Sequence, residues 1–138
     1  MWFTPLLLGG ASILSGTISR PNSDIVVSGW TSSDAQPLYT DIDEVIPSDV
    51  EYIYSPPLSG SIVAATFGLS LSLVAGNYDV NTRGRMTGSA SNMRVVLLDS
   101  GGVAVGTSAW QALTNTFATY TLNVTTTGTA TQVRIDAQ

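Results

Sequence analysis

Residues 93–102 read Met-Arg-Val-Val-Leu-Leu-Asp-Ser-Gly-Gly and carry the clearest structural signal in the chain. Five of the first six residues are apolar, and a run of that length before a turn is typical of a buried β-strand. The Asp-Ser-Gly-Gly that follows is a hairpin signal, because glycine adopts the positive φ angles that tight hairpin turns require. The stretch therefore predicts a strand over 93–98, buried on most of both faces, followed by a turn over 99–102.

Apolar and polar residues alternate on both sides of this stretch, as they do in half-buried strands. The inward positions are Phe67, Leu69, Leu71 and Leu73; Val80, Thr82, Gly84 and Met86; Ala118, Tyr120, Leu122 and Val124; and Val133 and Ile135. Turn-forming residues separate these runs, and no segment has the apolar spacing of an amphipathic helix. We predict an all-β fold of about eight strands: an antiparallel, jelly-roll-like β-sandwich over 23–138, preceded by an extended N-terminal arm over 1–22.

The composition excludes most catalytic chemistry. The 138 residues include five arginines but no lysine, histidine or cysteine, so the chain has no thiolate nucleophile, imidazole base, disulfide or ordinary zinc site. A carboxylate pair could still hydrolyse a glycoside, but no set of substrate-positioning residues accompanies one. The net charge of −5 offers no basic surface to nucleic acid or an anionic membrane. We expect a protein that is not an enzyme, needs no cofactor and binds neither nucleic acid nor membranes.

The charge is divided unevenly along the chain. The first 69 residues hold one arginine and seven acids, whereas the remaining 69 hold four arginines and three acids. Arg83 and Arg85 project from one face of their predicted strand and suit bidentate pairing with carboxylates such as Asp43 and Glu44. These pairs could form within the chain or with a neighbouring copy, and we predict that they mark a contact in a homo-oligomer.

Five acids lie close together in one short segment, at Asp41, Asp43, Glu44, Asp49 and Glu51. Carboxylate oxygens are ligands that calcium prefers, but the segment lacks the glycine turn and the spacing of a dedicated calcium loop. A solvated or arginine-paired loop is therefore the default interpretation, and a calcium site is the alternative.

Apolar residues dominate the N-terminal segment, which includes Trp2, Phe3, Leu6, Leu7 and Leu8. The segment has no basic residues and is far shorter than the ~20 residues of a membrane span, so we expect neither a signal peptide nor a membrane anchor. Left free, these side chains would form an exposed apolar patch, which soluble domains avoid. We predict that they dock onto another chain; the alternative is that the segment folds back and covers an edge strand of its own sandwich.

Tyr52 and Tyr54 lie two residues apart and would share one face of a strand. Two aromatic rings on one face can provide a flat platform for sugar rings, so the pair is a candidate glycan-facing site. Trp30, Trp110 and Tyr120 are instead expected to fill the sandwich core, where large aromatic side chains dominate burial.

A block of short motifs lies between residues 20 and 55. It comprises Arg20-Pro-Asn-Ser-Asp24, Gly29-Trp30, Leu38-Tyr-Thr-Asp-Ile-Asp-Glu44, Pro47-Ser-Asp49 and Tyr52-Ile53, and residues 117–124 add Phe-Ala-Thr-Tyr-Thr-Leu-Asn-Val. The pattern resembles one in small virion structural proteins of tailed bacteriophages and prophages, in which the block precedes a β-sandwich.

The resemblance implies a bacteriophage structural component located in the virion and made in the host cytoplasm. Of the locations we favour the capsid, as a decoration or minor capsid protein that attaches to the particle surface as an oligomer. Its partners would then be other virion proteins, above all the major capsid protein. The alternative is a tail or fibre component that acts as a glycan-binding or host-adhesion module.

Overall fold

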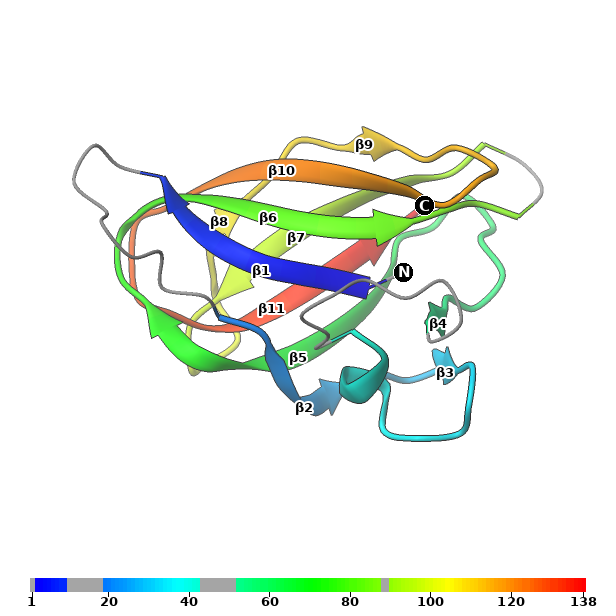
Figure 1. Ribbon diagram of the computed structural model, residues 1–138. Coiled ribbons are helices and arrows are strands. Elements are labelled where there is room, and N and C mark those ends of the chain that lie inside the picture. Colours follow the sequence, from blue (N-terminus) through cyan, green and yellow to red (C-terminus); the bar gives the residue numbers. More distant parts are fainter. Residues whose placement is uncertain (1, 10–18, 43–51, 88–89) are drawn as a thin grey trace.

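The computed structural model describes the backbone of residues 2–9 and all atoms of residues 19–42, 52–87 and 90–138. These residues form antiparallel sheets packed against each other, which confirms the predicted all-β sandwich (Figure 1). The first sheet has the order β1–β6–β10, with β1 at Trp2–Gly9, β6 at Gly76–Gly84 and β10 at Ala118–Thr126. The second sheet has the order β2–β5–β11–β7–β8, with bounds Pro21–Val26, Val63–Leu73, Ala130–Ala137, Asn92–Leu98 and Ala104–Thr107.

Three short elements complete the described structure. Strand β9, Gln111–Ala112, pairs with β7. Strand β3, Thr31–Ser32, pairs with β4, Ile53–Tyr54, beside the 3-10 helix η1 at Leu38–Asp41. Figure 1 shows β3, β4 and η1 together at one end of the sandwich.

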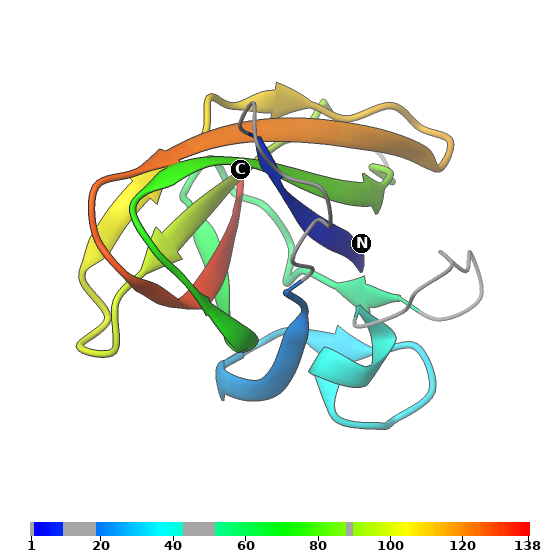
Figure 2. The same ribbon diagram turned by 60° about the vertical axis from the view of Figure 1, so that its left-hand side comes forward.

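Consecutive strands repeatedly change sheets, which is the jelly-roll-like feature of the fold. The chain leaves one sheet for the other between β5 and β6, between β6 and β7, and between β10 and β11. Figure 2 shows β6 and β10 in one layer and β11 in the other. Each sheet therefore combines strands that are distant in the sequence.

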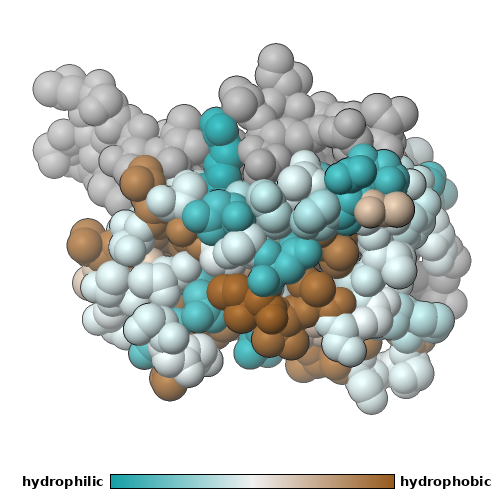
Figure 3. All heavy atoms as spheres, turned by 90° about the horizontal axis from the view of Figure 1, so that it is seen from below, coloured by the Kyte–Doolittle hydropathy of each residue, from teal (hydrophilic) through white to brown (hydrophobic). Residues whose placement is uncertain are grey.

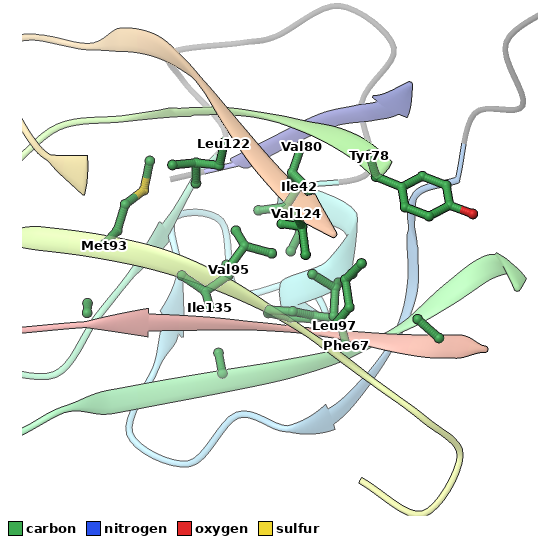
Figure 4. Close-up of a cluster of buried hydrophobic side chains, with 14 of the residues drawn as sticks. Ile42, Phe67, Tyr78, Val80, Met93, Val95, Leu97, Leu122, Val124 and Ile135 are labelled. Atoms are coloured by element: carbon green, nitrogen blue, oxygen red, sulfur yellow. The ribbon is translucent and has the colours of Figure 1, made fainter. Parts of the chain in front are cut away.

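The core lies between the two sheets and draws side chains from both (Figure 4). Its fully buried side chains include Val80 and Val124 from the first sheet, and Phe67, Val95, Leu97 and Ile135 from the second. The alternation predicted for β6, β7 and β10 is confirmed, and Val96 and Leu98 bury the second face of β7 as expected. Each of these aliphatic side chains stabilises the fold by about 1.5–3 kcal/mol when fully buried.

The inward position predicted for Leu71 is wrong, since its side chain is 47% exposed. The cause is an irregularity in the pairing of β5 with β11: Ala130 lies opposite Leu73, but Gln132 lies opposite Gly68. Four residues of β5, 69–72, therefore lie opposite one residue of β11, 131, and the bulge turns Leu71 outward. Leu71 joins Ile25 and Val26 of the neighbouring strand β2 as exposed hydrophobic residues, and Figure 3 shows such residues gathered on the lower side of the molecule.

The turn predicted after β7 is confirmed. Gly102 has a φ of +80°, and its amide donates to the Asp99 carbonyl at 3.1 Å. The Asp99 carboxylate also accepts hydrogen bonds from the amides of Gly101, at 2.8 Å, and Val103, at 2.9 Å. The aspartate and the glycine together fix the hairpin between β7 and β8.

Of the three aromatic residues assigned to the core, the structure places two in it or against it and one outside it. Trp30 is 5% exposed within the core, as predicted, and Tyr120 is partly buried against it. The prediction for Trp110 is wrong: its side chain is half-buried outside the core cluster. The Arg94 guanidinium lies 4.6 Å from the centroid of the Trp110 ring, so this indole packs against a cation instead.

Both described parts of the predicted N-terminal arm are paired with the sandwich. Residues 2–9 form β1, which runs antiparallel to β6. The Ser19 hydroxyl donates to the Leu71 carbonyl at 2.8 Å, and Pro21 begins β2 on the edge of β5. In this arrangement the N-terminal segment covers an edge strand of its own sandwich, which is the alternative that the sequence left open.

Candidate functional site

The motif block of residues 20–53 builds the framework of one end of the sandwich. The Asp24 carboxylate accepts hydrogen bonds from the amides of Leu38, at 2.9 Å, and Tyr39, at 2.8 Å. It thereby caps the start of η1, whose own N-terminal residue supplies no side-chain cap. Trp30 and Ile42 enter the core from the same block. These motif residues therefore have structural roles.

Asp41, at the end of η1, is a buried carboxylate with 1% of its surface exposed. Burial raises the pKa of Asp41, and the nearby Asp34 acts in the same direction. The Ser33 amide donates to its carboxylate at 3.2 Å, which partly opposes the shift. The hydrogen bond from the Ser33 amide therefore connects η1 to the residue that follows β3, and it depends on the protonation of Asp41.

Next to this framework lies a cleft of about 670 Å³, a size typical of small-ligand sites. Its lining is largely apolar and aromatic and includes Trp30, Tyr52, Tyr54, Pro56, Pro57, Leu58, Met86, Leu113 and Phe117. Polar groups line the same cleft at Ser55, Arg85, Thr87, Ser91 and Gln138. The cleft is thus formed by β4 and the segments that follow β4, β6 and β9.

An aromatic cluster of Tyr52, Tyr54 and Phe117 forms one wall of the cleft. The rings of Tyr52 and Tyr54 meet edge to face with centroids 4.8 Å apart, and Phe117 lies 5.7 Å from Tyr52. The Tyr54 hydroxyl donates to the Tyr52 hydroxyl at 2.8 Å, and this hydrogen bond raises the pKa of Tyr54. Tyr54 is 46% exposed, so the glycan-facing pair predicted from sequence lies at the surface of a cleft.

Arg83 and Arg85 both approach this aromatic cluster. Their guanidinium carbons lie 5.9 and 4.8 Å from the centroid of the Phe117 ring, which indicates cation–π contacts. Arg85 is exposed and lines the cleft, whereas Arg83 is half-buried and does not line it. Asp43 and Glu44, the carboxylates expected to pair with them, lie outside the described residues, so that prediction stays open.

The other two arginines of the second half pair with one carboxylate. Arg94 Nε lies 2.8 Å from Asp136 Oδ2, and Arg134 Nε lies 2.7 Å from Asp136 Oδ1. The Asp136 side chain has no exposed surface, and the two arginines are 26% and 31% exposed. These two cations are therefore engaged within the chain.

The predicted docking residues of the N-terminal segment all lie in β1. Its backbone register places Trp2 opposite Arg83, Phe3 opposite Thr82, Leu7 opposite Asp79 and Leu8 opposite Tyr78, while Leu6 falls at a register shift. The backbone of the segment thus pairs with the chain's own β6.

No group of three or more potential metal-ligating side chains occurs in residues 19–42, 52–87 and 90–138. The acids at 43, 44, 49 and 51 lie outside these ranges, so the calcium alternative stays a prediction. Within the same described part of the chain, no helix has the length and hydrophobicity to span a membrane.

Sequence reasoning missed Phe117 and the second role of Trp30. In the sequence Phe117 is only the first residue of the 117–124 motif, and its contact with Arg83 depends on the pairing of Ala118 with Gly84. Trp30 was assigned to the core alone, but the residue also lines the cleft, and its buried Nε1 has no hydrogen-bond partner among the described residues. The Trp30 donor has no sequence signal, because only tertiary packing determines its surroundings.

Comparison with protein-family models, curated proteins and solved structures gives no match for this chain.

Proposed function

We propose that the chain is a structural component of a bacteriophage virion, a capsid decoration or minor capsid protein that attaches to the particle surface as an oligomer. The observation that supports the proposal is the structural role of the motif block. Asp24 caps η1, and Trp30 and Ile42 anchor the block in the core. Residues that hold a fold together are a reason for two proteins to share a pattern, so the resemblance to phage structural proteins is one of fold framework.

The cleft favours binding over catalysis. No described residue that lines it has a side-chain carboxylate, and a glycoside hydrolase needs two converging ones. The chain also has no histidine, cysteine or lysine to replace them. We therefore propose that the protein acts through its surfaces.

Attachment to particles tests the proposal. Purified chain is mixed with heads and, separately, with tails of the phage or prophage that encodes it, and each mixture is sedimented. We expect the chain to sediment with heads as an oligomer. Sedimentation with tails alone would overturn the capsid assignment, and binding to neither would overturn the virion proposal.

Deletion of residues 1–10 separates the two roles of β1. If β1 docks onto a neighbouring protein, the deletion abolishes attachment and leaves a folded sandwich with nearly unchanged stability. If β1 only covers the edge of β6, as its backbone pairing indicates, the deletion lowers the free energy of unfolding and leaves attachment of the folded fraction intact. Circular dichroism and urea unfolding of the truncated chain distinguish these outcomes.

The second candidate function is glycan binding, in a tail or fibre component. The observation that favours it is the exposed edge of the aromatic cluster, where Tyr54 lies at the mouth of a cleft lined by two further aromatic residues of the cluster. Aromatic faces bind the apolar faces of sugar rings, and hydroxyl side chains on the rim offer hydrogen bonds to sugar hydroxyls. Isothermal titration of the chain with oligosaccharides tests it, and Tyr54→Ala is expected to weaken any binding at least tenfold.

A further inference from the structure

The charge of the cleft narrows the kind of ligand that it fits. Arg85 is the one charged side chain among the described residues that line it, although the chain as a whole carries a net charge of −5. No acidic side chain lies beside it among the described lining residues, so an anionic ligand is the partner that this lining favours. No ion pair joins Arg85 to a carboxylate within the described part of the chain.

The surroundings of Arg85 orient its side chain for a ligand. Its guanidinium stacks 4.8 Å from the centroid of the Phe117 ring, which restricts the side chain while leaving the edge of the planar fork available. The fork can donate two parallel hydrogen bonds to a carboxylate. Tyr54, on the other side of the cluster, remains 46% exposed and offers an aromatic face within the same cleft.

We propose that this cleft binds an acidic glycan, with the sugar carboxylate held by Arg85 and a sugar ring stacked on Tyr54. The inference rests on the glycan-binding candidate above and adds the class of sugar. A neutral glycan brings no counter-charge to the Arg85 guanidinium, whereas a uronic or sialic acid unit supplies one beside an apolar ring face.

Titration with paired ligands tests the class of sugar. The probes are oligogalacturonate, hyaluronan hexasaccharide and sialyllactose, each compared with its neutral methyl ester. We expect at least one acid to bind about tenfold more tightly than its ester, because a bidentate charge-assisted contact is lost on esterification. Arg85→Gln should abolish that difference, while Tyr54→Ala should weaken the acid and the ester alike.

Arg83→Gln is the matched control, since Arg83 also approaches Phe117 but does not line the cleft. It should leave the preference for the acid unchanged. Circular dichroism and the unfolding midpoint of each variant verify that the fold is intact. Equal binding of acid and ester would overturn the acidic class but leave glycan binding standing. Failure of every acid and ester to bind at millimolar concentration would overturn both.

Discussion

Asp136 shows how a single residue organises the outer face of the second sheet. It lies on β11 directly opposite Arg94 of β7, and Arg134 lies two residues earlier on the same strand and face. The guanidinium groups of both arginines reach its carboxylate, and Arg94 also stacks on Trp110. One carboxylate thus joins two strands and fixes an indole outside the core.

Asp136→Asn should be strongly destabilising. The substitution leaves two arginines facing each other without a counter-charge, and breaking a buried ion pair in this way costs about 3–5 kcal/mol. Urea unfolding at neutral pH measures the loss. The matched control is Asp79→Asn on β6, whose carboxylate accepts a hydrogen bond from the amide of Asn123, and there the loss should stay near 1 kcal/mol. Equal losses in the two variants would show that the arginine pairs contribute nothing.

At the same scale, Asp41 should make the stability of the fold depend on pH. Burial raises its pKa, so the folded chain holds this proton more tightly than the unfolded chain does. The stability that Asp41 contributes is therefore complete below the ordinary pKa of about 4 and is lost as the pH rises through the raised value. As the pH rises from 3 to 7, the free energy of unfolding of Asp41→Asn should therefore increase relative to that of the parent chain. Unfolding midpoints of both chains across that range measure the effect. A difference between variant and parent that stays constant with pH would contradict the prediction.

At the scale of elements, the contact between β8 and β10 determines how closely the two sheets approach. A Cβ atom added to Gly106 would lie 2.8 Å from the Thr125 carbonyl oxygen and 2.9 Å from a Val124 methyl group. Backbone cannot yield as a flexible side chain can, so only glycine fits there. The residue of β8 that faces β10 at this contact therefore has no side chain.

Gly106→Ala should therefore destabilise the sandwich by about 1–3 kcal/mol through overpacking. Gly76→Ala is the control, because its added Cβ would meet only the Tyr78 ring at 3.7 Å, an ordinary contact. That variant should be neutral or slightly stabilising, since alanine restricts the unfolded chain. Thermal unfolding measures both variants. Equal shifts in their unfolding temperatures would contradict the argument.

The sequence predicted the elements better than their pairing. The alternation of β6 and the apolar run of β7 identified their buried faces, and Asp99 with Gly102 identified a turn, because these signals are local. The outward position of Leu71 was not predictable, because it arises from a bulge that only the pairing of β5 with β11 creates. The aromatic cluster was half-predicted: Tyr52 and Tyr54 are neighbours in sequence, but Phe117 reaches them across the fold.

At the scale of the whole molecule, only some of the arginines in the second half of the chain are candidates for a contact between copies. Arg94 and Arg134 are paired within the chain by Asp136, so their charges need no second copy. Arg83 and Arg85 both approach Phe117, and Arg85 is exposed, so we place the contact between copies there. The predicted oligomer therefore depends on the surface around Phe117.

Arg83→Glu/Arg85→Glu should dissociate the oligomer, because charge reversal places like charges in the proposed contact. Light scattering measures the mass of the parent and the variant. The control Ser100→Glu/Thr129→Glu changes exposed turn residues away from Phe117 and should leave the mass unchanged. An unchanged mass for the arginine variant would overturn the assignment of this surface to a contact between copies.

The position of β11 has a consequence for how the protein is made. β11 lies between β5 and β7 in the second sheet, yet it is the last strand in the sequence. A ribosome delivers β5 and β7 well before residues 130–137, and until those residues leave the exit tunnel the two strands have no neighbour between them. The nascent chain is then an open sandwich with unpaired backbone edges. A premature stop before residue 130 would accordingly yield an aggregation-prone fragment rather than a smaller working protein.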